Sequence, residues 1–262
     1  MRPFTSPFGL VLEPLPVTGP EAVIPMKTRR SRRASVAAVL AGLATLLTPT
    51  AHAEAATSSH FTLTLHDTFT AGLNTARWGT YEGQPGGNPY GYWKASHVVG
   101  SSGNALLRGY RDSGRFVTGG MMLNSVTQTY GKYVVRAKFD RSTSIQHAML
   151  LWPTAGWPPE VDFSEGPTSQ GVMATSHWGS SNSQMHAFRK VDMTQWHTYG
   201  VEWTPTRLLF TIDGRGWAVM TGSAVPHQTM KLAIQTAATS SVPSSTPEVR
   251  LSIADVYVWS YH

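Results

Sequence analysis

The stretch that decides the fold is Glu160-Val161-Asp162-Phe163-Ser164-Glu165, in which three acids share six residues. Apolar residues alternate with the first two acids, as in a β-strand whose successive side chains point to opposite faces. Glu160 and Asp162 therefore share a face, whereas Glu165 has the wrong parity. One extra residue between Asp162 and Glu165, a β-bulge, would bring Glu165 onto that face, and bulges are common beside active sites.

Acids gathered on one face suggest acid–base chemistry. With the bulge, Glu160 and Glu165 lie about four strand steps apart, roughly 13 Å between backbones. Side chains that lean inward could bring the two carboxyls to about 5–5.5 Å, the separation of a pair that cleaves glycosides with retention. Carboxyls this close cannot all ionise easily, so we expect one to stay protonated near neutral pH. One strand would then supply an acid and a nucleophile.

Two other interpretations of the acids stay open. Charged residues are mostly exposed, so a solvated strand is the ordinary explanation for an acidic cluster. However, Trp152, Trp157, Pro158 and Pro159 crowd the approach, which is unusual for a solvated face. Carboxylates also bind calcium or magnesium, but calcium loops are usually richer in Asp, Asn and Gly. We therefore predict no metal at the acids.

The first 53 residues have the pattern of a leader rather than of a fold. Residues 26–33 form a basic run, residues 34–47 are apolar, and Ala51-His52-Ala53 matches a small-x-small cleavage site. Together these predict a secretory signal peptide over residues 26–53 and an extracellular protein, with Sec and Tat export both open. Its apolar run is shorter than the roughly twenty residues that span a membrane. Residues 1–25, rich in proline, are interpreted as a disordered segment or as sequence upstream of the true start.

The remaining residues, 54–262, predict one domain with little net charge. The chain as a whole carries +6, but 15 basic and 13 acidic residues remain without residues 1–53, a net charge of +2. This gives no electrostatic case for nucleic-acid binding. The chain has no cysteine, so packing rather than disulfides must hold the fold, and thiol chemistry is excluded.

Short alternating segments predict an all-β fold. Residues 133–139 alternate apolar and polar side chains, as a half-buried strand does. Asp213-Gly214 separates the strand-like runs 207–212 and 217–220, which is a strong hairpin signal. Residues 249–259 read as a long strand with one face made of Val249, Leu251, Ile253, Tyr257 and Trp259. Many short strands without cysteines favour a β-sandwich or jelly roll.

Several aromatic residues are candidates for sugar binding. Any one tryptophan is more often core than surface, but Tyr90 and Trp93 follow a Gly-rich segment, and Trp178 sits next to His177 before a glycine. Exposed rings along a cleft suit the apolar faces of sugars. The histidines do not have zinc-ligand spacing. The predicted substrate-binding residues are Tyr90, Trp93, Trp152, Trp157, His177 and Trp178.

The Glu-x-Asp-x-x-Glu segment resembles the signature of glycoside hydrolase family 16 in its bulged form. The resemblance covers almost all of residues 54–262 in the expected order, and this order is more specific than any single motif. It implies a β-jelly-roll sandwich, concanavalin A-like, with a concave cleft that binds a β-linked polysaccharide. The resemblance rests on residues 67–69, 73–78, 119–121, 130–138, 176–179, 196–205, 212–214 and 255–259.

The resemblance also implies a role for each acid. Glu160 would be the nucleophile, Glu165 the general acid/base, and Asp162 the residue that hydrogen-bonds and tunes the nucleophile. Departures from the family pattern concern the substrate: Pro159 replaces a common glycine, and His147 stands where proline is frequent. These substitutions affect positions beside the cleavage point.

The function expected first is secreted, retaining, endo-acting hydrolysis of β-1,3- or β-1,3-1,4-glucan within a single catalytic domain, residues 54–262. A non-catalytic carbohydrate-binding jelly roll, a transglycosylase and a galactan hydrolase of the same fold are the alternatives. We expect a monomer without cofactor that binds polysaccharide and neither nucleic acid nor membrane. Some relatives of this family bind a structural calcium ion. Asp255 and, less clearly, Asp67 are the candidate ligands here. That both are ordinary hydrogen-bonded aspartates is an interpretation at least as good.

Overall fold

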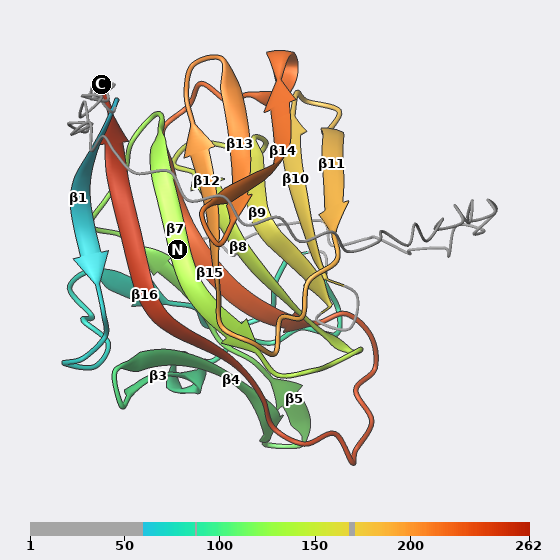
Figure 1. Cartoon of the computed structure of the whole chain (residues 1–262). Helices are drawn as coiled ribbons and strands as arrows, with labels where there is room; N and C mark the ends of the chain where they lie inside the picture. The colour runs from blue at the N-terminus through green and yellow to red at the C-terminus, as the bar shows by residue number, and fades with distance from the viewer. Residues whose placement is uncertain (1–59, 87, 168–170) are drawn as a thin grey trace, which may run out of the picture. The chain divides into compact units, whose positions relative to one another are not determined.

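A computed structural model describes residues 60–86, 88–167 and 171–262, which form two antiparallel sheets (Figure 1). The predicted upstream segment, residues 1–25, and signal peptide, residues 26–53, lie outside the described residues. The proposed domain limits therefore stay predictions. The all-β sandwich predicted from the alternating segments is confirmed.

The larger sheet has nine strands. Its main path runs β14-β13-β12-β7-β16-β4-β3, with β1 paired to β16 and β5 paired to β4 (Figure 1). The strands are β1 (Phe61–Asp67), β3 (Val98–Ser101), β4 (Asn104–Asp112), β5 (Arg115–Val117), β7 (Gly131–Phe139), β12 (His197–Trp203), β13 (Arg207–Ile212), β14 (Arg215–Thr221) and β16 (Val249–Tyr261).

The smaller sheet has seven strands and carries the acids. Its order is β11-β10-β9-β8-β15-β6-β2, so the acidic strand β9 lies near the middle, between β8 and β10. The strands are β2 (Trp78–Thr80), β6 (Gly120–Leu123), β8 (Ile145–Pro153), β9 (Glu160–Pro167), β10 (Val172–Trp178), β11 (Ser183–Arg189) and β15 (Met230–Ala238).

The main core lies between the two sheets. Val135 and Phe210 reach it from the larger sheet, and Met149, Phe163 and Leu232 reach it from the smaller one; all five are fully buried. A smaller apolar cluster lies apart from this core and includes Tyr81, Trp93, Met122, Ala148, Leu150 and Ala233. Strand β9 is buried along almost its whole length, because Val161 and Phe163 fill the core while the acids face the opposite side.

Two strand predictions are confirmed. Strand β7 alternates buried and partly exposed residues from Gly131 to Phe139, as its sequence pattern indicated. Asp213 and Gly214 connect β13 and β14, which pair as an antiparallel hairpin. Both residues have positive φ, 51° and 73°, the backbone conformation that favours Asp-Gly in tight hairpins.

The predicted face of the last strand is wrong beyond its middle. Val249, Leu251 and Ile253 are buried as expected, but a register shift against β7 falls between Ile253 and Asp255. This irregularity inserts one extra residue and exchanges the two faces. Val256 and Val258 consequently fill the core, whereas Tyr257 and Trp259 are only partly buried.

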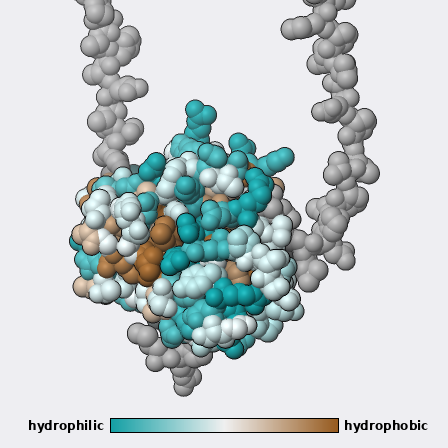
Figure 2. Space-filling model, turned by 90° about the horizontal axis from the view of Figure 1, so that it is seen from below, coloured by the Kyte–Doolittle hydropathy of each residue, from teal (hydrophilic) through white to brown (hydrophobic). Residues whose placement is uncertain are grey.

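Helix is scarce in the described part of the chain. Its two helices are single 3-10 turns, Ala95–His97 and Gly222–Ala224, and neither is long or apolar enough to cross a membrane. Seen from below, the surface is mostly hydrophilic, with one brown apolar group of side chains on the left (Figure 2).

Candidate active site

A β-bulge in β9 brings the three acids to one face. On β8, Met149 pairs with Ser164 and Leu150 pairs with Asp162, so that Phe163 is the extra residue. The pairing with β10 shifts over the same residues. The bulge predicted between Asp162 and Glu165 is therefore confirmed.

The partners of the acids on β10 establish their common orientation. Glu160 pairs with His177, Asp162 with Thr175, and Glu165 with Met173. These three β10 residues are two apart, so their side chains share a face, and directly opposite residues on neighbouring strands share it too. The three acids are 1%, 1% and 7% exposed, which excludes a solvated acidic surface.

Each acid has a polar neighbour. The indole Nε1 of Trp157 donates to Oε2 of Glu160 at 2.7 Å, and the hydroxyl of Thr175 donates to Oε2 of Glu165 at 3.2 Å. His177 Nε2 lies 3.5 Å from Oδ2 of Asp162. Each acid thus has a different neighbour, and hydrogen bonds orient Glu160 and Glu165.

A second contact positions His177. Its Nδ1 lies 2.8 Å from Oδ1 of Asn182, and its ring centroid is 6.1 Å from that of Trp157. The imidazole therefore bridges the acidic strand and the turn that follows β10. Sequence reasoning predicted His177 as a sugar-binding residue, and the structure places it against Asp162.

Burial raises the pKa of all three carboxyls. The charge of Asp162 raises the pKa of Glu160 further, and the charge of Glu165 does the same for Asp162. His177 and Thr175 act in the opposite direction on the pKa of Glu165. Buried acids that repel one another cannot all ionise, so the cluster holds protons at a pH where free carboxyls have lost them.

The smaller apolar cluster supports the acids. Its members Leu150 and Ala148 pair directly with Asp162 and Glu165 across β8 and β9. Tyr81 belongs to this cluster, and burial together with the charge of Glu160 raises its pKa. A Cβ on Gly120 would lie 2.2 Å from the Tyr81 ring, so glycine is needed there to admit the tyrosine. The low polarity of this surface explains why charge on the acids is costly.

The predicted aromatic residues divide into two groups. The expectation that Trp93 is an exposed platform is wrong: its side chain is 3% exposed, packs on Tyr81, and donates its indole N–H to the Thr236 carbonyl oxygen. Tyr90 is 52% exposed, as expected. Half-buried Trp152 packs against the smaller apolar cluster that lies beside the acids.

A pocket of about 790 Å³ adjoins the acids. Trp157 and Trp178 both line it, together with Pro158 and Pro159. The indole of Trp157 also bonds to Glu160, so this residue contacts both the pocket and the acid cluster. It offers aromatic surface of the kind that sugar rings contact.

The side chains that could bind a metal ion form contacts with other protein groups. Glu160, Asp162 and His177 offer atoms within 4.8 Å of one another, a set that could bind a divalent cation. The indole donor on Glu160 and the apolar surroundings suit shared protons instead. Of the two calcium candidates, Asp67 accepts hydrogen bonds from Phe69 and Trp78, and Asp255 pairs with His66.

Three residues of the site were missed by sequence reasoning. Thr175 could have been found, because it precedes His177 by two residues on a strand and must share its face. Tyr81 and Asn182 offered no such signal. Tyr81 lies far from the acids in sequence, and Asn182 reaches His177 through a turn whose geometry no local pattern indicates.

The fold and the site together suggest a class of protein: an antiparallel β-sandwich with a buried carboxyl cluster on one sheet resembles the paired-carboxyl sites of glycoside hydrolases. The model of glycosyl hydrolases family 16 matches residues 87–253, more than half of the chain. The chain belongs to this family.

Curated relatives match shorter segments. Endo-1,3-1,4-beta-glycanase ExsH of Rhizobium meliloti (strain 1021) is 36% identical over 104 residues, which are 37% of this chain and 22% of that protein. Endo-1,3-1,4-beta-glycanase EglC of the same organism is 30% identical over 142 residues, or 51% of this chain and 30% of that protein. The chain thus spans less than a third of each relative.

Solved structures support the fold. The laminarinase from Rhodothermus marinus has a TM-score of 0.69 at 19% identity, covering 78% of this chain and 98% of that one. The laminarinase catalytic domain from Thermotoga maritima MSB8 has a TM-score of 0.67 at 17% identity, covering 77% and 99%. At such identities the likeness establishes the shared sandwich.

Proposed function

We propose that this chain is a secreted, retaining endo-hydrolase of β-1,3- or β-1,3-1,4-linked glucan. The observation that carries the proposal is the bulged strand β9, which puts Glu160, Asp162 and Glu165 on one buried face. The names of the curated relatives, both endo-1,3-1,4-beta-glycanases, support the same substrate class.

In the proposed mechanism, Glu160 and Glu165 have complementary tasks. Glu165 donates its proton to the departing glycosidic oxygen while the Glu160 carboxylate attacks the anomeric carbon, which forms a covalent ester and breaks the glycosidic bond. Glu165, now ionised, takes a proton from water, and the resulting hydroxide displaces Glu160 from the sugar. Two inversions at one carbon give net retention.

The neighbours of the acids support this division of labour. The hydrogen bond from Trp157 stabilises the charged form of Glu160, which is the form needed for attack. Burial raises the pKa of Glu165, as it does that of Glu160, and favours the protonated form that a general acid needs. Asp162, buried between them, would take up or release a proton as the charge of Glu160 changes during the cycle.

The decisive test is Glu160→Gln in the full chain, assayed on laminarin, mixed-linkage glucan, xyloglucan, agarose and carrageenan. We expect the parent chain to release reducing ends from a β-glucan, and the variant to lose at least about 10³-fold in rate because no covalent ester can form. A matched folding control is the far-UV and near-UV circular dichroism of both proteins. Retained activity in a folded variant would exclude Glu160 as nucleophile.

Three further measurements separate the finer parts of the proposal. Proton NMR of the first product anomer distinguishes retention from inversion. Product sizing distinguishes hydrolysis from transglycosylation, because only transfer makes sugars longer than the starting one. N-terminal sequencing of protein recovered outside the cell tests secretion, with cleavage expected after Ala53.

A further inference from the structure

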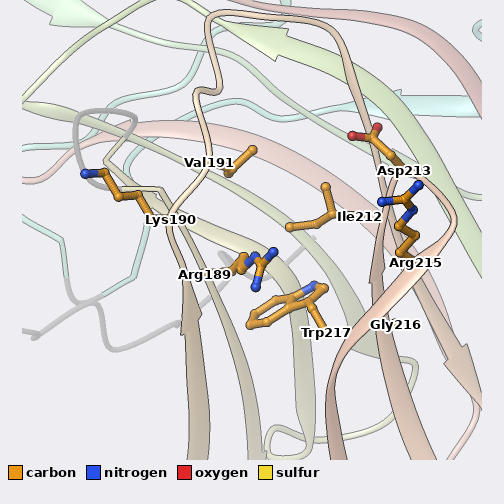
Figure 3. A pocket seen from close by; sticks show the side chains of 8 residues that line it. All are labelled: Arg189, Lys190, Val191, Ile212, Asp213, Arg215, Gly216 and Trp217. Atoms are coloured by element: carbon orange, nitrogen blue, oxygen red, sulfur yellow. The ribbon is translucent and has the colours of Figure 1, made fainter. Parts of the chain in front are cut away.

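A second pocket lies where the edge strands of the two sheets meet (Figure 3). Strand β11 is the edge of the smaller sheet, β14 is an edge of the larger one, and the two strands are in contact. The pocket has a volume of about 670 Å³ and is lined by residues 189–191, 212, 213 and 215–217. This volume is within the range of small-molecule sites. None of its lining residues belongs to β9 or β10, so it is distinct from the acid site.

The floor of the pocket is apolar and aromatic. Val191, Ile212 and Trp217 are half-buried there, and the Trp217 ring packs 6.3 Å from that of Phe210 in the core. The indole nitrogen of Trp217 is shielded from water and has no hydrogen-bond partner within the described part of the chain. An unused buried donor is unfavourable.

The rim of the pocket is basic. Arg189, Lys190 and Arg215 are exposed, and none forms an ion pair or side-chain hydrogen bond with another residue that the structure describes. In Figure 3 the guanidinium of Arg189 lies beside the Trp217 ring, whereas Lys190 extends away from it. Two guanidinium groups and an aromatic ring therefore border the same space.

The single acidic residue of the lining is already engaged. Asp213 Oδ2 lies 2.7 Å from Nδ1 of His197, and Asp213 Oδ1 accepts a hydrogen bond of 2.9 Å from the Thr198 backbone. Its hydrogen bonds are thus directed toward β12, while the nearby charge of Arg215 helps to lower the pKa of Asp213. The pocket therefore has an excess of positive charge, in a protein whose described part is almost neutral.

We propose that this pocket binds an acidic sugar unit, with the carboxylate on Arg189 and Arg215 and the sugar ring against Trp217. Guanidinium forks match a carboxylate geometrically, and indole surface suits the apolar face of a pyranose. The anion preference follows from the pocket alone; the choice of a sugar rests on the proposed function. The site would hold the enzyme to acidic sugars that accompany the β-glucan, while the acids of β9 cleave the glucan itself.

The test follows the indole N–H signal of Trp217 in ¹H–¹⁵N spectra of the full chain. The chain has nine tryptophans, so Trp217→Phe assigns the signal by its disappearance. Glucuronate, glucose and sodium sulfate are titrated at matched ionic strength. We expect glucuronate to shift this signal saturably, glucose to leave it in place, and Arg189→Ala to weaken glucuronate binding about tenfold or more.

Arg207→Ala is the matched control for charge. Arg207 begins β13 at the far end of the same hairpin and does not line the pocket, so its removal should leave glucuronate binding unchanged. An unmoved Trp217 signal, or equal loss in both variants, would overturn the proposal. Equal responses to sulfate and glucuronate would overturn the proposal of a sugar site and indicate a site for anions only.

Activity on neutral β-glucan is measured on the same variants. Arg189→Ala should keep the parent rate on the neutral polymer, because the pocket does not contain the acids. A parent chain without glucanase activity but with glucuronate binding would reject the proposed function and retain the pocket. The two failures are therefore distinguishable.

Discussion

The indole of Trp157 donates a hydrogen bond of 2.7 Å to Glu160, and this bond acts against the burial that raises the pKa of the same carboxyl. Trp157→Phe keeps an aromatic ring and removes the donor. A hydrogen bond to a charged group contributes about 1.5–3 kcal/mol, so we expect kcat/KM to fall roughly 10–100-fold. Because the nucleophile must be ionised, the acid limb of the pH–rate profile should move to higher pH.

Thr175→Val provides the complementary control for this prediction. It removes the hydroxyl that lowers the pKa of Glu165 and leaves Glu160 untouched. The general acid must be protonated, so this change should move the alkaline limb of the profile upward and leave the acid limb in place. If both variants moved the same limb, the roles assigned to Glu160 and Glu165 would be wrong, whatever the loss in rate.

At the scale of single residues, the sequence predicted the positions of the three acids better than the positions of the aromatic residues around them. Strand parity and the bulge correctly placed Glu160, Asp162 and Glu165 together, because both are local properties of one segment. Trp93 was wrongly expected to be exposed. Its Gly-rich flank resembles a surface loop, but its burial depends on Tyr81 and on strand β15, which no local pattern connects to it.

At the scale of elements, bulges decide which side chains reach the core. The alternation of residues 249–259 predicts Tyr257 in the core, whereas the register shift after Ile253 puts Val256 and Val258 there instead. The bulge in β9 was predictable because a required acid had the wrong parity. The one in β16 was not, because both faces of that strand are rich in apolar residues.

The face assignment of β16 can be tested by unfolding. Val258 is fully buried, so Val258→Thr places a hydroxyl among apolar atoms and should lower the free energy of unfolding by about 1–3 kcal/mol. Tyr257→Phe on the other face should cost less than about 0.5 kcal/mol. Urea titrations of both variants give the comparison. The reverse ranking would restore the simple alternation.

At the scale of the whole molecule, the sandwich followed from many short alternating segments without cysteines, but the order of strands within each sheet did not. Neighbours such as β7 and β16 lie more than a hundred residues apart in the chain. Their pairing is determined by which apolar faces meet across the core. The smaller sheet carries two kinds of buried titratable group, the acids and His147. These make the stability of the fold depend on pH in opposite directions.

His147 is fully buried, and its Nε2 lies 2.9 Å from Oγ of Ser164, the residue beside the bulge. Burial lowers the pKa of His147 to about 4 from 6.5. Between these values the unfolded chain binds a proton that the folded chain does not, so this residue destabilises the fold as pH falls, by about 3 kcal/mol in total. Below the folded pKa its contribution no longer changes with pH.

The buried acids make stability depend on pH in the opposite direction. Their raised pKa values let the folded chain hold protons that the unfolded chain has lost, so their contribution weakens the fold as pH rises. The pH dependence of unfolding in the unmodified protein is therefore the sum of the two contributions. His147→Gln retains a partner for Ser164 without a titrating ring, and the difference in unfolding free energy between variant and parent isolates the histidine. We expect this difference to shift in favour of the variant as pH falls from 7 toward 4, measured by urea unfolding at fixed ionic strength. Parallel curves would mean that His147 is protonated in the fold or exposed to water, and its burial beside the bulge would then be wrong.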